Sequence, residues 1–441
     1  MKNKRVYNHP WRYAMAMFGL SIMGYMYTTF GTFFYNDKLG LPLATIGIGS
    51  VLFSIWDAFN DPITGFLSDR TRSRFGRRKP WLLISTPIFA VAAVLFFSPP
   101  GALGNGFALA VYFTFFLMLT ETANTIATVN YHSLLPELFR ETDKRNRANA
   151  IRQALQLVGM IIGVSLVPMI VSAFGKMTGS DVGGYRLTAA VLGLLGGALM
   201  LYSFFGVKER DDFSHMPQPK LWASLKAVFA NRNFWMVSVS HFFYQATTAL
   251  LLAGIPFFIK YTLKQPDSMA TILSACVFVS AIPSMYLWYK LINRLGTLKV
   301  WRIALLWLAL ALGVMYFANG LAFASVAGIL VGIGIAGVTA NLDMVNSELI
   351  EADYRRSGIR REATFFAAIS FVTRLSGLVR SVIFMLLTAW FGFVSSDNPG
   401  AQPGDAAKFM MVVFPFVLML ISFTVSQFVS FKAANHSEAK A

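Results

Sequence analysis

The chain has few charged residues and almost no cysteine. Asp, Glu, Lys and Arg make up 13% of its 441 residues, whereas a soluble protein of this length carries roughly a quarter. Its single cysteine, Cys276, excludes an intrachain disulfide bond. The sequence contains no His/Cys cluster with metal-ligand spacing, no glycine-rich phosphate loop and no Ser/His/Asp order. These absences exclude a soluble enzyme and predict a chain without a cofactor.

Apolar residues dominate the sequence and form long runs. Hydrophobic side chains account for 56% of the chain, and Phe alone occurs 41 times. A helix needs about 20 apolar residues to cross roughly 30 Å of hydrocarbon. Twelve stretches are long enough. We therefore expect an all-α membrane protein with twelve transmembrane helices, at 13–36, 42–68, 80–99, 106–136, 147–174, 186–207, 233–260, 268–290, 299–318, 321–350, 362–394 and 407–431.

Weak internal repetition divides these spans into two halves. The longest polar connection is Lys208 to Arg232, and Glu-Leu followed by basic residues occurs after span 4 and again after span 10. Parallel six-span repeats are expected of the major facilitator fold, with substrate held near the midplane. The predicted organisation is an N-terminal six-helix bundle at 1–207, a cytoplasmic linker at 208–232, a C-terminal six-helix bundle at 233–431 and a cytoplasmic tail at 432–441.

The net charge of +17 is unevenly distributed along the chain. Of the 38 Lys and Arg residues, only six fall at the predicted outer ends of the spans and three within spans, if both termini are cytoplasmic. This is the positive-inside bias of membrane proteins, so it predicts that orientation and argues against a nucleic-acid partner. We expect a multi-pass protein of a cell membrane, with the short loops favouring a bacterial inner membrane.

Two carboxylates lie inside an apolar span and precede a block of arginines. Asp57 and Asp61 are four residues apart and share one helix face with Asn60. An ionised side chain at bilayer depth costs on the order of 2.5–3.5 kcal/mol, so this pair indicates a cation-binding site in a transporter. The alternative is that the aspartates pair with an intramembrane arginine and only hold the bundle together.

These residues also carry a family resemblance. The run Asp57-Ala-Phe-Asn-Asp-Pro62, with the Asp69 to Arg77 loop, resembles the signature of the glycoside-pentoside-hexuronide:cation symporters, the melibiose permease-like group of the major facilitator superfamily. The run Glu348 to Tyr354, followed by Arg360-Arg361-Glu362, is similar to the loop that this family carries after span 10. The resemblance covers all twelve predicted spans.

The resemblance implies a set of cation ligands. In the melibiose permease branch they correspond to Asp57, Asn60 and Asp61 on span 2 and Thr125 on span 4, so the family pattern is retained. Oxygen donors suit Na⁺ at Asp57 and Asp61, and a pair of carboxylates can instead share a proton, so the coupling ion stays open between Na⁺ and H⁺. Glu121 is an additional acid one turn from Thr125; it is either a cation ligand or a salt-bridge partner of another helix.

The sugar-contacting positions depart from the melibiose pattern. Carboxylates and an aromatic residue of that permease correspond to Ser21, Thr128 and His132, so melibiose itself is not expected as the substrate. Arg152 matches a sugar-site arginine, Arg374 replaces a lysine, and Arg380 adds a further intramembrane charge. Guanidinium groups bind carboxylate and sulfate bidentately, which keeps an acidic sugar open beside a neutral one.

Charged residues at the predicted inner ends of the spans are candidates for a cytoplasmic gate. Opposite charges on the two halves can close that side and separate when it opens. The expected function is cation-coupled symport of a sugar, glycoside or hexuronide by a monomer. A lysophospholipid or other amphiphile transporter of the same fold and a non-transporting membrane sensor are the alternatives. The gate candidates are Asp69, Arg70, Arg77, Glu137, Glu348, Glu351 and Arg361.

Overall fold

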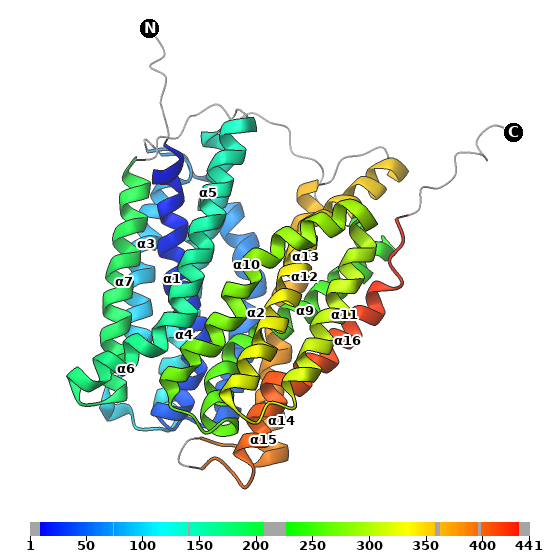
Figure 1. Cartoon of the computed structure of the whole chain (residues 1–441). Coiled ribbons are helices and arrows are strands. Elements are labelled where there is room, and N and C mark those ends of the chain that lie inside the picture. The colour runs from blue at the N-terminus through cyan, green and yellow to red at the C-terminus, as the bar shows by residue number, and fades with distance from the viewer. Residues whose placement is uncertain are drawn as a thin grey trace, which may run out of the picture. The chain divides into compact units, whose positions relative to one another are not determined.

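The computed structural model of the chain describes residues 9–73, 75–139, 142–206, 226–357, 362–395 and 398–431. Within these ranges every regular element is helical, which confirms the predicted all-α class. The first half comprises α1 (Pro10–Phe33), α2 (Leu43–Arg70), α3 (Lys79–Phe96), α4 (Phe107–Leu138), α5 (Thr142–Met160), α6 (Val167–Thr178) and α7 (Asp181–Gly206). The second comprises α9 (Arg232–Phe257), α10 (Ala270–Leu295), α11 (Thr297–Met315), α12 (Leu321–Ser357), α13 (Glu362–Arg374), α14 (Gly377–Phe391), α15 (Pro403–Lys408) and α16 (Phe414–Ser426) (Figure 1).

Short π-helical segments extend or join several of these helices. Phe34–Lys38 follows α1, Ile161–Leu166 joins α5 to α6, Phe258–Thr262 follows α9, and Phe409–Val413 joins α15 to α16. Short 3₁₀ turns at Gly101–Leu103 and Asp267–Met269 precede α4 and α10. With these continuations the described helices match the twelve predicted spans. Eleven are long and apolar enough to cross a membrane by length and composition, and α1, with 24 residues, is the remaining long helix.

Local sequence explains where helices begin and end. Pro10 occupies the first turn of α1, where the missing proline N–H has no helical partner to lose. Gly179 ends α6 with φ of 72°, a left-handed conformation that glycine adopts without steric cost. The polar C-terminal part of α12 continues as helix to Ser357, seven residues beyond the predicted end of the apolar span at 350. Apolarity located the membrane segment, whereas backbone hydrogen bonding extends the helix past it.

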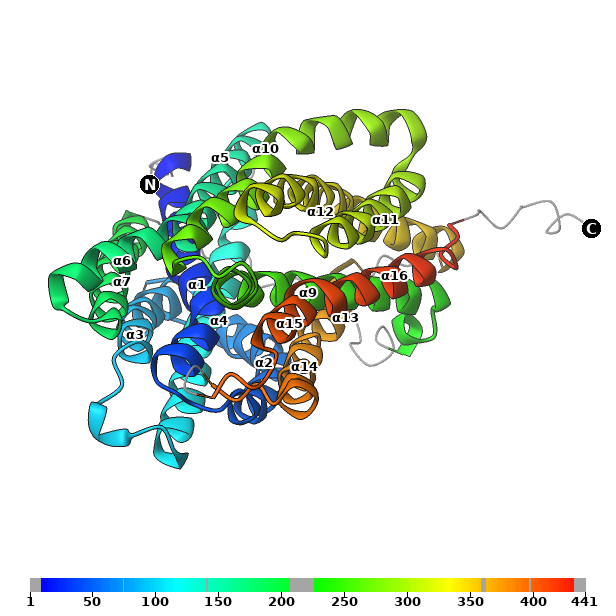
Figure 2. The same ribbon diagram turned by 60° about the horizontal axis from the view of Figure 1, so that its bottom comes forward.

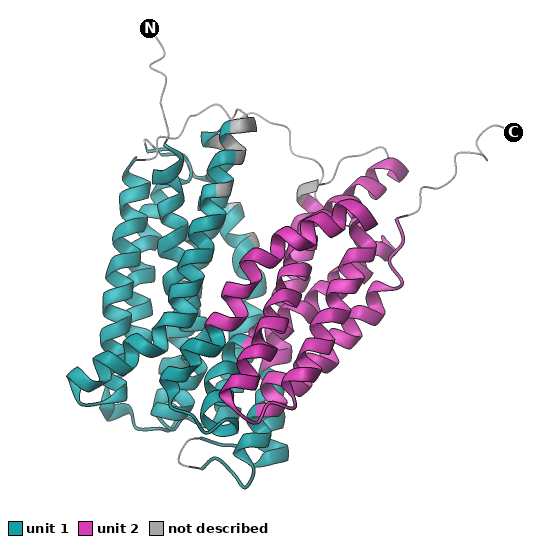
Figure 3. Ribbon diagram, viewed as in Figure 1, with its two compact units in different colours: residues 1–216, 252–274, 381–407 teal, residues 217–251, 275–380, 408–441 magenta. Residues whose placement is uncertain are grey.

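The chain divides into two compact units (Figure 3). Unit 1 contains Met1–Met216, Leu252–Ser274 and Ser381–Ala407, and unit 2 contains Pro217–Leu251, Ala275–Arg380 and Lys408–Ala441. Unit 1 therefore holds the first six spans together with two short pieces of the second half. The proposed boundaries of two six-helix bundles remain a prediction.

Within unit 1, α1 packs against α5 and α7, while α4 packs against α2 and α3 (Figure 2). Glycines allow the close approach of α1 to α5 and to the π-helical segment after it: a Cβ on Gly159 of α5 would lie 2.7 Å from the Cβ of Ser21, and one on Gly163 would lie 2.7 Å from the Ile22 carbonyl oxygen. In unit 2, α11 packs between α12 and α16. Small residues at helix contacts are the usual means of helix association in membranes.

An aromatic cluster fixes the end of α1. Tyr35 donates a hydrogen bond to the Phe96 carbonyl oxygen at 2.7 Å, and Phe97 stacks on Tyr185 with ring centroids 5.9 Å apart. Phe34 packs 5.1 Å from Tyr185. All of these side chains are buried. The cluster joins α1, α3 and α7, and so holds the following residues, Asp37 and Lys38, in place.

Candidate functional site

Helix α2 buries its polar face and exposes its apolar face. A helix of a soluble protein shows the reverse pattern, because water covers its outer face. The exposed side therefore suits lipid, and the buried side faces the protein interior, where polar groups in a membrane protein are concentrated. The buried side chains are Ser50, Ser54, Asp57, Asn60, Thr64 and Ser68, and the exposed ones include Ile48, Leu52, Phe59, Ile63 and Leu67.

Two contacts set the register between α2 and α4. The Trp56 indole donates a hydrogen bond to the Thr122 hydroxyl at 2.8 Å. Seven residues earlier in α2, a Cβ on Gly49 would lie 2.5 Å from the Thr114 hydroxyl oxygen. Because the partners advance along both helices in the same direction, the helices run parallel, and Thr125 lies at the depth of the Asp57–Asp61 turn.

The predicted cation ligands occupy this buried turn. Asp57, Asn60 and Thr125 expose 8%, 3% and 1% of their surface, and Asp61 is half-buried. The Asn60 amide nitrogen and the Thr125 hydroxyl are buried and have no hydrogen-bond partner among the described residues. Buried polar groups are normally hydrogen-bonded, so the Thr125 hydroxyl oxygen has unused capacity for a ligand, whereas the Asn60 amide nitrogen is a donor and would not bind a cation.

The kind of ion that suits the turn follows from its donor set. No group of three or more His, Cys, Asp or Glu side chains with metal-binding geometry occurs in the described part of the chain. A transition-metal site therefore has no support there. An alkali cation would depend on the hydroxyl of Thr125 and the amide of Asn60 as well as on the aspartates, since hard cations prefer oxygen ligands.

A separate pocket lies between α1, α4 and α5 of unit 1. Its volume is about 230 Å³. Three predicted site residues meet in it: Ser21 from α1, and Glu121 and Thr128 from α4. The structure thus brings a predicted cation ligand together with two predicted substrate positions. The remaining lining residues are Met17, Leu20, Gly24, Tyr25, Tyr27, Thr28, Asn124 and Gln156.

Glu121 faces α1 in this pocket. The Tyr27 hydroxyl donates a hydrogen bond to one carboxylate oxygen of Glu121, and the Asn124 amide donates to the other at 3.4 Å. Thr128, one turn further along α4, donates to the Asn124 carbonyl oxygen at 2.5 Å. Tyr27 and Asn124 were not predicted as site residues. Asn124 lies three residues from Glu121, so helical spacing could have identified it, whereas Tyr27 depends on how α1 packs.

Arg152 is buried on α5, one turn before the pocket residue Gln156. Its Nε and one terminal nitrogen donate to the Asn149 side-chain oxygen at 3.1 and 2.8 Å. Its other terminal nitrogen lies 3.3 Å from Nε2 of His132. The structure therefore groups two of the predicted substrate residues, Arg152 and His132, beside the pocket, although neither lines it.

The other two predicted substrate arginines belong to unit 2. Arg374 ends α13, and Arg380 lies in the first turn of α14, so the two flank the interruption between these helices. Both side chains are half-buried. Their assignment to the substrate site remains a prediction.

Much of the predicted gate falls outside the described residues. This applies to Arg361 and to the side chains of Asp69, Arg70 and Glu137. Among the described members, Arg77 and Glu348 are half-buried. Glu351 is exposed and lies 3.4 Å from Arg355, four residues along the same helix. Such an exposed pair within one helix contributes little to stability.

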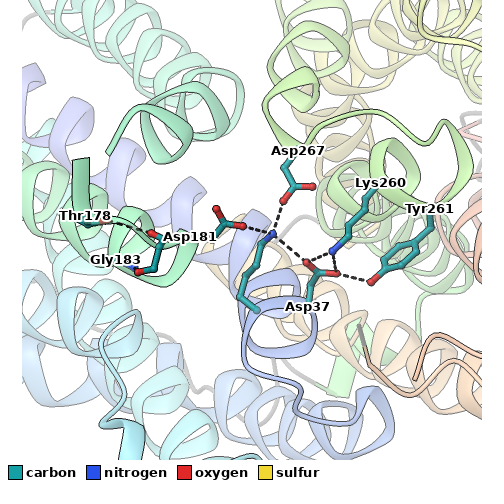
Figure 4. Close-up of polar contacts among 9 residues, drawn as sticks. Asp37, Thr178, Asp181, Gly183, Lys260, Tyr261 and Asp267 are labelled. Atoms are coloured by element: carbon teal, nitrogen blue, oxygen red, sulfur yellow. Dashed lines mark hydrogen bonds and ion pairs between the residues drawn. The ribbon is translucent and has the colours of Figure 1, made fainter. Parts of the chain in front are cut away.

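An ion-pair network lies at the opposite end of unit 1, where α1 ends and α7 begins. Lys260 Nζ lies 2.6 Å from both carboxylate oxygens of Asp37, and the Tyr261 hydroxyl donates to the same carboxylate at 2.5 Å (Figure 4). The Asp37 side chain is fully buried. The network thereby joins the chain after α1 to the chain after α9.

Lys38 is the second cation of this network. Its Nζ lies 2.6 Å from Asp267, 2.8 Å from Asp181 and 3.3 Å from Asp37. Burial lowers the pKa of Lys38, but the surrounding carboxylates outweigh it and hold this pKa above its ordinary value. Asp181 starts α7 beside a turn in which the Gly183 amide donates to the Ser180 hydroxyl at 3.0 Å.

This network was not predicted from the sequence. Lys38 and Lys260 are two of the six basic residues at the predicted outer ends of the spans. The signal present in the sequence is that the outer ends also contain Asp37, Asp181 and Asp267, which balance these lysines. Which acid pairs with which lysine depends on contacts between residues more than 200 positions apart, such as Asp37 and Lys260.

Comparison with known proteins places this arrangement in a family. The family described as MFS/sugar transport protein matches residues 12–432. The chain belongs to this family. Its members are transporters and not enzymes, and the resemblance stated from the sequence motifs is thereby confirmed.

Relatives of this family align over most of their lengths. The uncharacterized symporter YnaJ of Bacillus subtilis is 26% identical over 93% of this chain and 89% of its own. The isoprimeverose transporter of Lactiplantibacillus pentosus is 23% identical over 94% and 87%. The sodium-dependent lysophosphatidylcholine symporter 1 of Xenopus tropicalis is 24% identical over 84% and 77%.

Solved structures confirm the fold. A bacterial homologue of the human lysosomal transporter Spinster, in an inward-facing and unoccupied conformation, superimposes with a TM-score of 0.75 at 15% identity, covering 98% of this chain and all of the other. The fold is that of the major facilitator superfamily, with twelve transmembrane helices.

Proposed function

We propose that the protein is a secondary active transporter that couples the movement of Na⁺ or H⁺ to symport of a sugar, glycoside or hexuronide by alternating access. The observation that carries this proposal is a pocket of about 230 Å³, lined in part by hydroxyl, amide and carboxylate groups, beside a buried acidic turn. The pocket and the Asp57–Asp61 turn approach α4 from different sides. One helix thus adjoins both candidate sites, as coupling of two ligands requires.

Three observations support symport of a sugar in particular. The family is a sugar-transport family, and one relative is an isoprimeverose transporter. The pocket lining contains hydroxyl, amide and carboxylate groups that can bind sugar hydroxyls. Relatives that are symporters align over nearly the whole chain, which supports coupling to a cation.

The orientation of the protein follows from its charge. We infer cytoplasmic termini, because the basic residues concentrate on the side that carries the termini. The short loops favour a bacterial inner membrane, and a monomer stays a prediction. In this orientation the network of Asp37, Lys38, Lys260 and Asp267 lies at the outer side. It links chain segments from both halves, and its ion pairs would separate when the transporter opens outward.

The second candidate function is transport of a lysophospholipid, which the Xenopus relative performs by its name. That substrate carries an acyl chain and needs a long apolar cavity. The pocket of unit 1 has a volume of about 230 Å³, small for an acyl chain, and its lining includes hydroxyl, amide and carboxylate groups beside apolar surface. We therefore place sugar first.

The test is transport by the full-length protein in liposomes. Asp61→Asn should abolish accumulation driven by a Na⁺ or proton gradient, while exchange of labelled sugar across the membrane persists, because the charge that balances the cation is lost. Asp405→Asn, an exposed residue of α15, is the matched control and should behave as wild type. Unchanged accumulation by Asp61→Asn would sink the assignment. Uptake of lysophosphatidylcholine without uptake of any sugar would establish the second candidate.

A further inference from the structure

Two basic side chains meet at the C-terminal end of α7. Arg12, in the first turn of α1, donates from Nε to the Tyr202 carbonyl oxygen at 3.1 Å. Lys79, the first residue of α3, donates from Nζ to the Phe205 carbonyl oxygen at 3.4 Å. We propose that these two cations bind the phosphate of an anionic phospholipid in the leaflet at this end of the helices. The inference goes beyond the proposed transport function and does not depend on the transported substrate.

The ends of three packed helices bring these cations together. Both α1 and α3 pack against α7 (Figure 1). Helix α7 ends at Gly206, so its last carbonyl groups have no helical N–H partner. Basic side chains near a helix C-terminus are attracted to these carbonyls and to the negative end of the helix dipole. The helix end explains why both cations gather there, but it engages only part of the Arg12 guanidinium.

Arg12 keeps hydrogen-bond donors for a further ligand. A guanidinium presents a planar fork of N–H groups, and Arg12 uses its Nε for the bond to Tyr202. Its two terminal nitrogens have no acceptor within the part of the chain that the structure describes. Such a fork matches the oxygens of a phosphate group and can bind them bidentately. The donors that α7 leaves unused therefore suit a phosphate.

The Arg12 guanidinium is held in place by α7. Its central carbon lies 4.7 Å from the centroid of the Tyr202 ring, which is a cation–π contact. A Cβ on Gly206 would overlap the Nε and Cζ atoms of Arg12, so the missing side chain at this position makes room for the guanidinium. A donor that is fixed before binding loses less conformational entropy when its ligand arrives.

A second helix end, in unit 2, shows an arginine that mainly caps a helix. Arg302 of α11 donates to the carbonyl oxygens of Ser426, Gln427 and Val429 at 3.2, 3.3 and 2.8 Å, where α16 ends. It therefore uses Nε and a terminal nitrogen for the backbone, whereas Arg12 uses Nε alone. The two arginines carry the same charge at the same kind of helix end, so Arg302 is a matched comparison for Arg12.

The surroundings of Arg12 suit a lipid and not a small soluble anion. Trp11, Tyr202 and Phe205 are exposed. In a membrane protein, exposed apolar side chains contact lipid, and Trp and Tyr are enriched at the level of the head groups. Basic residues at this level attract anionic lipids. A phospholipid would place its phosphate on the cations and its acyl chains along these rings, whereas free phosphate would make only the first contact.

Thermal unfolding of the full-length protein tests the site. The purified, delipidated protein is mixed with dodecyl maltoside micelles that carry rising fractions of palmitoyl-oleoyl phosphatidylglycerol, or of the phosphatidylcholine with the same chains. A ligand that binds only the folded state raises the Tm, so the lipid fraction that gives half of the rise reports its affinity. We expect wild type to respond more strongly to phosphatidylglycerol. Arg12→Gln should raise the half-saturating fraction at least about fivefold, the factor that one cation contributes at a membrane surface.

Two further variants separate a built site from general attraction by positive charge. Arg302→Gln removes the same charge and should lower the Tm without lipid, because backbone hydrogen bonds are lost, but it should keep the wild-type response to phosphatidylglycerol. Gly206→Ala keeps the charge of Arg12 and forces its guanidinium out of place, so it should weaken the response as Arg12→Gln does. Gly206→Ala also provides a second reading if Arg12→Gln is poorly folded.

Four outcomes would overturn the inference. A wild-type response to phosphatidylglycerol in both Arg12→Gln and Gly206→Ala would exclude the site. Equal losses in Arg12→Gln and Arg302→Gln would show general charge attraction. An equal response of wild type to phosphatidylcholine would exclude an anionic lipid as the preferred ligand. An equal rise in Tm with inorganic phosphate in place of lipid would make the ligand a soluble phosphate compound.

Discussion

Lys260 Nζ lies 2.6 Å from both carboxylate oxygens of Asp37, although the two residues are 223 positions apart in the chain. Asp37 is fully buried at its side chain, and Lys260 exposes 31% of its side chain. A buried carboxylate is costly unless it is paired and hydrogen-bonded. This pair therefore holds together two distant parts of unit 1, the end of α1 and the end of α9.

Removal of the Lys260 charge alone should destabilise the protein more than removal of both charges of the Lys260–Asp37 pair. Lys260→Ala leaves Asp37 buried beside Lys38 and Tyr261 alone, and we expect a loss of roughly 1–3 kcal/mol, between the values for exposed and buried pairs. The double variant Lys260→Ala/Asp37→Asn should recover part of this loss, because no buried charge is left unmatched. Thermal unfolding in detergent measures both. Additive effects of the two single changes would contradict a direct interaction.

The sequence predicted the helices of this protein better than their contacts. The thickness of the bilayer requires long apolar runs, so the positions of the twelve spans follow from hydropathy alone. Boundaries are less certain where the helix leaves the membrane, as in α12, which continues to Ser357. The π-helical segment at Ile161–Leu166 could not be predicted from the sequence. It packs against α1, and no local residue pattern encodes that contact.

The site was predicted in its residue types and only partly in its grouping. Glu121, Thr125, Thr128 and His132 are four, three and four residues apart, a spacing that predicts one stripe of a helix, but a stripe can face more than one neighbour. In the structure Glu121 meets α1, whereas the adjacent Thr122 meets α2. The network of Asp37, Lys38, Lys260 and Asp267 involves pairs far apart in sequence, and no local pattern encodes such contacts.

The charge of Lys38 gives a defined pH dependence. Its pKa lies above the ordinary 10.5, since the attraction of Asp267, Asp181 and Asp37 outweighs burial. A lysine with a raised folded pKa contributes its full stabilisation below the unfolded pKa and loses it as pH rises through the folded value. The difference in Tm between wild type and Lys38→Met should therefore stay constant from about pH 7 to pH 10 and shrink only above that. A difference that already declines between pH 7 and 9 would contradict the assigned ion pairs.

Arg152 should affect substrate affinity and leave cation coupling intact. Its guanidinium is held by Asn149 and lies beside His132, one turn from the pocket residue Gln156. We expect Arg152→Ala to raise the half-saturating sugar concentration about tenfold, because the guanidinium holds Asn149 and His132 beside the pocket. Arg152→Lys should recover little, because an ammonium cannot reproduce the planar fork that donates twice to Asn149. Arg186→Ala, which loses only a hydrogen bond to the Pro99 carbonyl oxygen, is the control. Equal sugar affinity in Arg152→Ala would remove this residue from the substrate site.

The glycine at position 163 should be essential for the shape of the pocket. A Cβ there would lie 2.7 Å from the Ile22 carbonyl oxygen and 3.0 Å from the Cβ of Tyr25, a pocket residue. Because the oxygen belongs to the backbone of α1, Gly163→Ala must push the helix away, at a cost of about 1–3 kcal/mol. We expect a lower Tm and weaker sugar binding. Gly313→Ala in α11 would place its Cβ 3.6 Å from Phe416, an ordinary contact, and should leave Tm unchanged or slightly raised. The same response in both variants would show that helix propensity, and not the approach of α1, determines the effect.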